Sequence, residues 1–382
     1  MKILIGTDVS VLVNGCKIYA KNKYATIFNR YYTAFGTIVL FSRVEYSTQP
    51  EKDCVEITNI IDSIIPITSL KDILLNKYNK TIMAHMQSCD LVIARCPSMS
   101  GYKVADCARK LNKPVFTESM GCAWDAYWNH GIVGKIIAPY MFLKMRTVVK
   151  KADYALYVTR DFLQKRYPCK CESLSASNVL IENVDTSILA KRLKKKVGSE
   201  LALMTTAAVN VKYKGQQYVI RAIPRLNALG IRVKYILVGE GDVAYLRHEA
   251  ETYGVADQVE FKGRLPLSRI FDLLDKTDIY IQPSLQEGLP RAMIEAMSRG
   301  CVCIGAKTAG IPELIEEKFV VRRKSVSDIV RTVSDYMNES LDMHQLTFVR
   351  NFEEARKYES SILDERRNSY YEKVKKEIYH EN

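Results

Sequence analysis

The 382-residue sequence has no apolar run that approaches the ~20 residues of a membrane-spanning helix. Its first apolar stretch, residues 3–5, is too short for the hydrophobic region of a signal peptide. The ten cysteines include no Cys-x-x-Cys pair, and no Cys/His set has the spacing of a zinc site. These absences predict a cytoplasmic protein with reduced thiols and no bound metal.

Motifs of several nucleotide enzymes are also missing. No Walker A motif occurs, and the strand candidate 2–6 is followed by a single glycine, Gly15, rather than by Gly-x-Gly-x-x-Gly. Gly239 and Gly241 follow another strand candidate, but the third glycine is absent. We therefore expect no nicotinamide and no other cofactor. The 23 tyrosines are suited to stack on bases, but no recognised nucleic-acid motif accompanies them, so no nucleic-acid partner is predicted.

The excess of positive charge lies in the first half of the chain. Residues 1–200 contain 29 Lys and Arg against 17 Asp and Glu, whereas residues 201–382 contain 27 against 26. This asymmetry favours an anionic partner for the first half, such as a membrane surface; a basic surface that only aids solubility is the alternative. Residues 136–151 interleave apolar and basic side chains, which fits an interfacial helix on anionic lipid or a core helix with a basic last turn.

Short apolar runs alternate with longer mixed segments along the whole chain. The runs have the composition of parallel strands that are buried on both faces: 2–6, 37–41, 90–95, 114–118, 154–159, 179–182, 201–207, 233–239, 259–263, 278–283 and 301–305. Helical patterns lie between them, for example at 216–229 and 267–274. This alternation predicts a doubly wound α/β fold. It runs twice, with a charged break at 190–199. We expect two Rossmann-like domains, residues 1–196 and 197–354, that face each other across a ligand-binding cleft.

The most informative segment, residues 282–300, reads QPSLQEGLPRAMIEAMSRG. It predicts a buried strand, a loop and a helix, with Pro290 in the first helical turn. The amides and the dipole of a helix N-terminus bind anions, and a diphosphate fits that description. Glu287 precedes the helix and Glu295 lies inside it. The two carboxylates are therefore suited to accept hydrogen bonds from a sugar and from a ribose.

These motifs resemble the signature of the family-four retaining glycosyltransferases, which have the GT-B fold. The matching motifs are Glu-Gly-Leu-Pro at 287–290, Glu-Ala-Met at 295–297, Thr-Ala-Gly-Ile-Pro-Glu-Leu-Ile at 308–315, Lys-Gly at 214–215, Val-Gly-Glu-Gly at 238–241 and Phe-Lys-Gly-Arg-Leu at 261–265. The match covers about residues 201–320. The first half resembles the family only in its alternation of strands and helices.

The resemblance implies roles for individual residues. Glu287 would contact the donor sugar and Lys214 would neutralise the diphosphate, as the catalytic pair. The remaining positions implied for the nucleotide sugar are Lys212, Gly215, Gly239, Arg264, Leu265, Gly288, Leu289, Pro290 and Glu295.

The resemblance also implies an activity. It is a metal-independent hexosyl transfer, with retained configuration, from a UDP- or GDP-sugar, and the absence of an Asp-x-Asp motif fits it. The implied acceptor is a glycan or a lipid-linked glycan of surface polysaccharide, capsule or lipopolysaccharide synthesis, at the inner face of an anionic membrane. A C-terminal helix of about residues 355–382 would return to the first domain.

The first domain departs from the family pattern on the acceptor side. Its glycine-rich loop is reduced to Gly15, and the position of the family's histidine holds Glu118, with His130 as a substitute twelve residues later. Lys212 takes the place of an arginine, which differs from lysine in binding phosphate. Two other readings stay open: a GT-B sugar-nucleotide epimerase or hydrolase, and a non-catalytic scaffold that binds nucleotide sugars.

Overall fold

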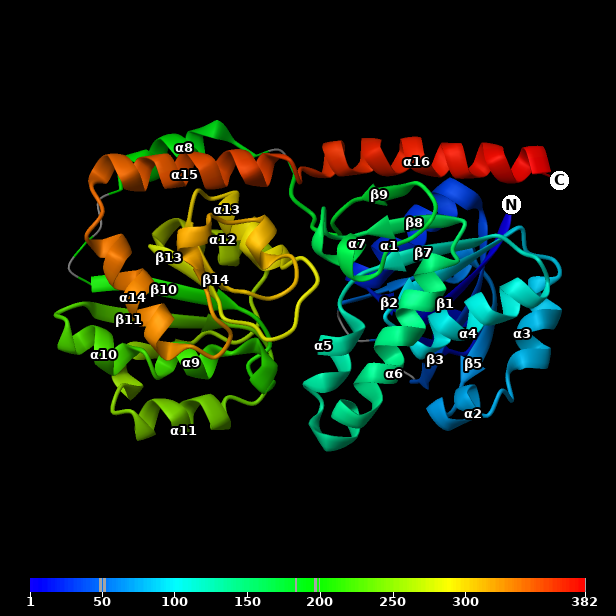
Figure 1. Ribbon diagram of the computed structural model, residues 1–382, viewed down its shortest axis with the longest axis horizontal. Helices are drawn as coiled ribbons and strands as arrows, with labels where there is room; N and C mark the ends of the chain where they lie inside the picture. Colours follow the sequence, from blue (N-terminus) through cyan, green and yellow to red (C-terminus); the bar gives the residue numbers. More distant parts are fainter. Residues whose placement is uncertain (48–49, 51–52, 183, 196–197, 199, 382) are drawn as a thin grey trace. The chain divides into compact units, whose positions relative to one another are not determined.

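The computed structural model describes residues 1–381 apart from 48–49, 51–52, 183, 196–197 and 199. The chain divides into two compact units (Figure 1). Unit 1 comprises Met1–Ala176 and Glu365–Asn382, and unit 2 comprises Ser177–Asp364. The predicted boundary at 196/197 falls outside the described residues, and the division lies about twenty residues earlier.

Unit 1 is built on a sheet whose parallel strands have the order β5-β3-β1-β6-β7-β8-β9. The far end of β1 pairs with β2 in an antiparallel hairpin, and β4 adds to β2. The strands are β1 (Lys2–Asn14), β2 (Lys17–Lys21), β3 (Thr37–Tyr46), β4 (Cys54–Glu56), β5 (Ile61–Ile67), β6 (Leu91–Cys96), β7 (Val115–Ser119), β8 (Tyr154–Tyr157) and β9 (Ser173–Ser175).

Helices cover this sheet and complete its core. They are α1 (Asn22–Phe35), α2 (Leu70–Leu74), α3 (Asn79–Met86), α4 (Met99–Lys110), α5 (Ala123–Trp128), α6 (Gly131–Lys150), α7 (Phe162–Arg166) and α16 (Ser360–Glu381). Helix α16, red in Figure 1, adds Tyr371 and Val374 to the buried cluster formed by strand residues such as Ile5 and Phe116. The last helix of the chain is thus part of the core of the first unit.

Unit 2 contains a six-stranded sheet of order β12-β11-β10-β13-β14-β15, in which every recorded pair is parallel. Its strands are β10 (Glu200–Thr206), β11 (Arg232–Val238), β12 (Val259–Phe261), β13 (Ile279–Gln282), β14 (Val302–Ala306) and β15 (Val320–Val321). Its helices are α8 (Thr186–Leu193), α9 (Gln216–Ile220), α10 (Ile223–Ala228), α11 (Ala244–Thr252), α12 (Leu267–Lys276), α13 (Arg291–Met297), α14 (Val326–Met337) and α15 (Leu341–Arg356). Both units therefore have the doubly wound order, with a switch point beside the first strand.

Helix α8 belongs to unit 2, and its residue Arg192 ties it there. The guanidinium is buried and donates to three backbone carbonyl oxygens: to Leu274 at 2.7 Å, to Thr277 at 2.6 Å and to Arg299 at 3.0 Å. These bonds satisfy carbonyls at the ends of two helices, so α8, in which the expected break 190–199 begins, is held in unit 2.

Two other sequence predictions are wrong in detail. Residues 179–182 form no strand; Val179 and Ile181 are buried, but the Ile181 carbonyl accepts from the Ser360 amide instead of a strand neighbour. The predicted helix 216–229 is two helices, α9 and α10, and Pro224 stands in the first turn of the second. Across the described residues, no helix is both long and apolar enough to cross a membrane.

Candidate functional site

The site lies where β10 and β13 run side by side in unit 2. These strands are the first and the fourth of the unit in sequence, so their carboxyl ends flank the switch point at which open α/β sheets bind ligands. The loop after β10 carries Lys214, and the loop after β13 carries Glu287. Lys214 Nζ lies 2.8 Å from Glu287 Oε1, although 73 positions separate the two residues. The fold thus joins the two predicted catalytic residues.

Hydrogen bonds hold the Glu287 carboxylate in place. Gln282 Nε2 donates to Glu287 Oε1 at 3.0 Å and to Ser284 Oγ at 2.7 Å, and its Oε1 accepts from the Tyr280 hydroxyl at 2.7 Å. The side chains of Lys214 and Glu287 are 21% and 11% exposed, so the pair is shielded but reachable. The sequence reasoning missed Gln282. The feature that could have revealed it is a single amide side chain at the end of an otherwise apolar strand.

Two glycines allow the loops of the site to approach closely. A Cβ on Gly215, which has φ of +79°, would lie 2.1 Å from the Pro283 carbonyl oxygen. A Cβ on Gly239 would lie 1.9 Å from the Ala207 carbonyl oxygen. Any larger residue would therefore force these backbones apart. The Gly239 amide also donates to the Gly263 carbonyl at 2.9 Å, which joins the loops after β11 and β12.

Glu295 is the second carboxylate of the motif and lies inside α13. Burial raises the pKa of its carboxyl group, and the nearby Arg291 guanidinium opposes this effect. None of the described residues donates a hydrogen bond to the Glu295 carboxylate. A desolvated acceptor without a protein donor is suited to hydroxyl groups of a ligand.

The approach to α13 differs slightly from prediction. Pro290 is the N-cap residue and not the first helical residue, and no side chain caps the helix. Leu289 is buried, and the Gly288 carbonyl accepts from the Gly310 amide at 2.9 Å. The Thr-Ala-Gly motif at 308–310 therefore supports the loop that precedes the helix.

The other predicted donor residues follow strands of the same sheet. Lys212 opens the short helical turn that ends at Lys214, and its ammonium lies 4.4 Å from the Tyr245 ring centroid. Arg264 and Leu265 follow β12, and Arg264 Nη1 lies 3.6 Å from Glu240 Oε2. All predicted donor residues are thus at the carboxyl edge of the sheet of unit 2.

The three acceptor-side candidates lie on different elements of unit 1. Gly15, with φ of +57°, forms the tip of the β1–β2 hairpin and is not in a loop that leads to a helix. His130 is the exposed N-cap residue of α6. Glu118 ends near the carboxyl edge of β7 but is only 2% exposed; it pairs with Arg95 Nε at 2.6 Å and accepts from the Tyr31 hydroxyl at 2.9 Å.

Comparisons with known proteins show the family of the chain. Residues 188–352 match the family described as Glycosyl transferases group 1. Over 318 residues the chain is 30% identical to Protein CapJ of Staphylococcus aureus. This match covers 81% of the chain and 79% of CapJ. The chain belongs to the group 1 glycosyltransferases. This group 1 glycosyltransferase is also similar to the putative colanic acid biosynthesis glycosyltransferase WcaL of Salmonella typhimurium. The two are 31% identical over 159 residues, which are 40% of this chain and 38% of WcaL.

Solved structures share the fold of this glycosyltransferase along its whole length. The structure of Anabaena HepE in complex with UDP matches with a TM-score of 0.67 at 13% identity, over 98% of this chain and 100% of HepE. The GT-B fold expected from the sequence is thereby confirmed.

Proposed function

We propose that this glycosyltransferase moves a hexosyl group, with retained configuration, from a UDP-sugar to a glycan or lipid-linked acceptor of surface polysaccharide synthesis, such as capsule or lipopolysaccharide. The observation that carries the proposal is the Lys214–Glu287 pair at the switch point of unit 2. In the transfer, the anomeric carbon exchanges its bond to a diphosphate oxygen for a bond to an acceptor oxygen on the same face. The nucleoside diphosphate leaves, and its departing phosphate oxygen takes the proton of the acceptor hydroxyl.

Lys214 supports the departure of the diphosphate. Negative charge builds on the leaving group, and a fixed cation in a shielded site stabilises it. An ammonium has three donor hydrogens, so the bond to Glu287 leaves others for phosphate oxygens. The backbone amides at Gly288 and Leu289 are further proposed phosphate ligands. Lys214 would thus supply the positive charge that a metal ion supplies elsewhere, in keeping with a metal-independent reaction.

The two carboxylates take different parts of the donor. Glu287, held by Gln282, faces the sugar hydroxyls, and Glu295 accepts from the two ribose hydroxyls. Each hydrogen bond from a ribose hydroxyl would offset part of the free-energy cost of desolvating the Glu295 carboxylate. HepE was solved with UDP and with UDP-glucose, which supports uridine over guanosine as the base.

The acceptor is proposed to bind unit 1 at the inner face of an anionic membrane. Unit 1 contains 29 Lys and Arg against 18 Asp and Glu, and unit 2 contains 27 against 25. A basic surface of this kind favours an anionic or lipid-linked acceptor. WcaL, named for colanic acid biosynthesis, supports a polysaccharide product.

Thermal unfolding with UDP, GDP, ADP and CMP tests the donor site. A nucleotide at a hundredfold excess over Kd stabilises the native state by about 2.7 kcal/mol. We expect UDP to raise Tm, Glu295→Ala to weaken this shift, and the exposed control Glu251→Ala to leave it unchanged. The absence of a shift with every nucleotide would refute the donor site. Release of UDP from the donor without any acceptor would instead favour an epimerase or hydrolase.

A further inference from the structure

Helix α6 of unit 1 has an apolar stripe on its solvent side. Ile132 is 78% exposed and Ile136 is 73% exposed, and Val133, Tyr140 and Leu143 are exposed as well. At about 100° per residue these five positions fall within a ~100° arc, and they extend over ~16 Å of helix. Isolated exposed apolar residues are ordinary, but a continuous stripe marks an interaction surface.

The opposite side of α6 provides the packing that the fold needs. The buried residues of the helix are small or apolar: Gly134, Ala138, Met141, Met145, Val148 and Val149. They lie roughly 150° around the helix from the centre of the stripe. The stripe is therefore additional to the core contact, and folding of unit 1 does not explain it.

The exposed apolar surface continues onto α2. Leu74 of α2 and Tyr140 of α6 line one cavity of about 220 Å³, so the two helices are neighbours there. Leu74 and Leu75 are both exposed, at 58% and 65%. The surface thus spans two elements and is wider than one helix face.

The charged side chains of α6 itself are all basic. Between Asp125 and Asp153 the sequence contains no acidic residue and five basic ones: Lys135, Lys144, Arg146, Lys150 and Lys151. Lys150 and Lys151 end the helix and are exposed. Lys144 pairs with Asp106 of α4, but the other four cations are matched by no acid on α6. An apolar stripe on a helix whose own charges are all positive is typical of helices that lie in the interface of an anionic bilayer.

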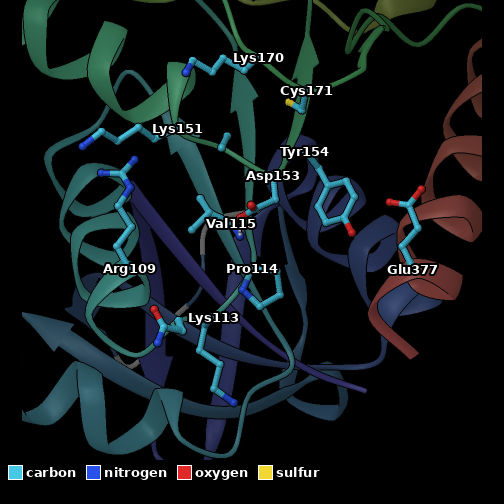
Figure 2. A pocket seen from close by; sticks show the side chains of 12 residues that line it. Arg109, Lys113, Pro114, Val115, Lys151, Asp153, Tyr154, Lys170, Cys171 and Glu377 are labelled. Carbon is cyan, nitrogen blue, oxygen red and sulfur yellow. Dashed lines mark hydrogen bonds between the residues drawn. The ribbon is translucent and has the colours of Figure 1, made fainter. Parts of the chain in front are cut away.

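A basic pocket adjoins the C-terminal end of α6. It has a volume of about 760 Å³, and its cationic lining residues are Arg109, Lys113, Lys151 and Lys170. Figure 2 shows the Arg109 and Lys151 side chains on one wall, with Lys113 at the far end and Glu377 of α16 opposite. Lys151 is both the C-cap of α6 and a lining residue, so the positive charge is continuous from the helix into the pocket.

We propose that the apolar stripe of α6 is a membrane-docking surface that inserts into the interface of an anionic phospholipid bilayer, with the cations at its end against lipid phosphates. A second copy of this chain is a poorer occupant, because a two-fold interface would bring the same cations face to face. The proposal locates the membrane contact of the proposed function, but it depends on unit 1 alone and not on the donor assignment.

Vesicle sedimentation of the full chain tests the proposal. We compare phosphatidylcholine vesicles with and without phosphatidylglycerol, using the stripe variant Ile136→Gln/Tyr140→Gln/Leu143→Gln. The matched control, Leu229→Gln/Leu346→Gln/Tyr379→Gln, removes equally exposed side chains elsewhere. We expect wild type and control to bind the anionic vesicles, and the stripe variant to bind about tenfold less tightly or worse. Lys150→Ala and Lys151→Ala should each weaken binding about fivefold and reduce its salt dependence.

Three results would overturn the proposal. They are failure of the wild type to bind anionic vesicles, equal binding by the stripe variant, and concentration-dependent dimerisation that the stripe variant loses while neither protein binds vesicles. The Tm and the UDP-induced shift of each variant are measured in parallel. An unchanged Tm excludes misfolding, and a missing UDP shift in the wild type would affect the proposed function without affecting the membrane result.

Discussion

The ion pair between Arg95 and Glu118 is predicted to stabilise unit 1 and not to bind acceptor. Both side chains are almost fully buried, with Arg95 Nε 2.6 Å from Glu118 Oε2. Burial raises the pKa of Tyr31 well above its usual value, so its hydroxyl stays protonated and donates to the same carboxylate. The substitution Glu118→Gln keeps the shape of the side chain but removes its charge. The Arg95 guanidinium then stays buried without its counter-ion.

The expected loss of stability is large. Removing one partner of a buried pair costs about 3–5 kcal/mol. For a domain of this size 1 kcal/mol corresponds to about 2–4 °C in Tm, so unit 1 should melt at least ~6 °C earlier. The measurement is differential scanning calorimetry of the full chain. Glu172→Gln is the control, because that carboxylate and its partner Lys373 are exposed and solvent screens their interaction.

A double variant separates lost stability from lost function. Arg95→Met with Glu118→Leu replaces the pair by apolar side chains, and such replacements are often neutral. We expect it to regain most of the Tm that Glu118→Gln loses, together with the transferase activity. If Glu118→Gln kept the wild-type Tm and lost only activity, the structural assignment would be refuted and Glu118 would return as an acceptor residue.

Three further predictions concern unit 2. Glu295→Gln should raise Tm at neutral pH and weaken the UDP-induced shift. Burial raises the pKa of the Glu295 carboxyl group in the folded protein, so its ionisation destabilises the fold only above the pKa of the unfolded state. In a calorimetric pH series, the Tm values of wild type and variant should therefore converge near pH 4. Gly215→Ala should lower Tm by more than Gly230→Ala does and should abolish the UDP-induced shift. Both glycines have positive φ, +79° and +76°, but a Cβ would meet a carbonyl oxygen only at Gly215. Equal losses of Tm in the two variants would refute the clash. Arg192→Met should destabilise unit 2 by about 2–4 kcal/mol in a urea titration, because the Thr277 and Arg299 carbonyls lose the Arg192 donor and the Leu274 carbonyl loses one of its donors. The exposed Lys191→Met should have little effect.

The donor side was predictable from sequence because its signals are local. The strands that carry it are short apolar runs buried on both faces, and Glu287, Gly288 and Pro290 stand at fixed offsets from the end of β13. The register of β10 beside β13 then follows from the doubly wound order. The roles of the residues remain a proposal, but their gathering at one edge follows from the fold.

The elements that were missed depend on partners far along the chain. Strand β2 alternates polar and apolar residues and forms only because β1 extends past Gly6 to meet it. Conversely, residues 179–182 have strand composition, but no strand lies beside them. Glu118 was predicted as a site residue because it stands where the family has a histidine, and only the fold reveals Arg95 next to it. Long-range pairing is the information that local patterns lack.

The two units share one strand order but differ in what occupies the switch point. In unit 1, Asp8 of β1 accepts from the amides of Met99 at 3.0 Å and of Ser100 at 3.2 Å, so a carboxylate of the protein already fills the N-terminus of α4. In unit 2, no side chain caps α13, and the only acid in the preceding loop, Glu287, is paired with the Lys214 cation. An internal anion excludes a diphosphate from the first position, whereas an uncapped turn beside a cation favours one in the second. Among the described residues, the two switch points of the same fold thus differ in charge, and that of unit 2 is the one that suits the proposed nucleotide site.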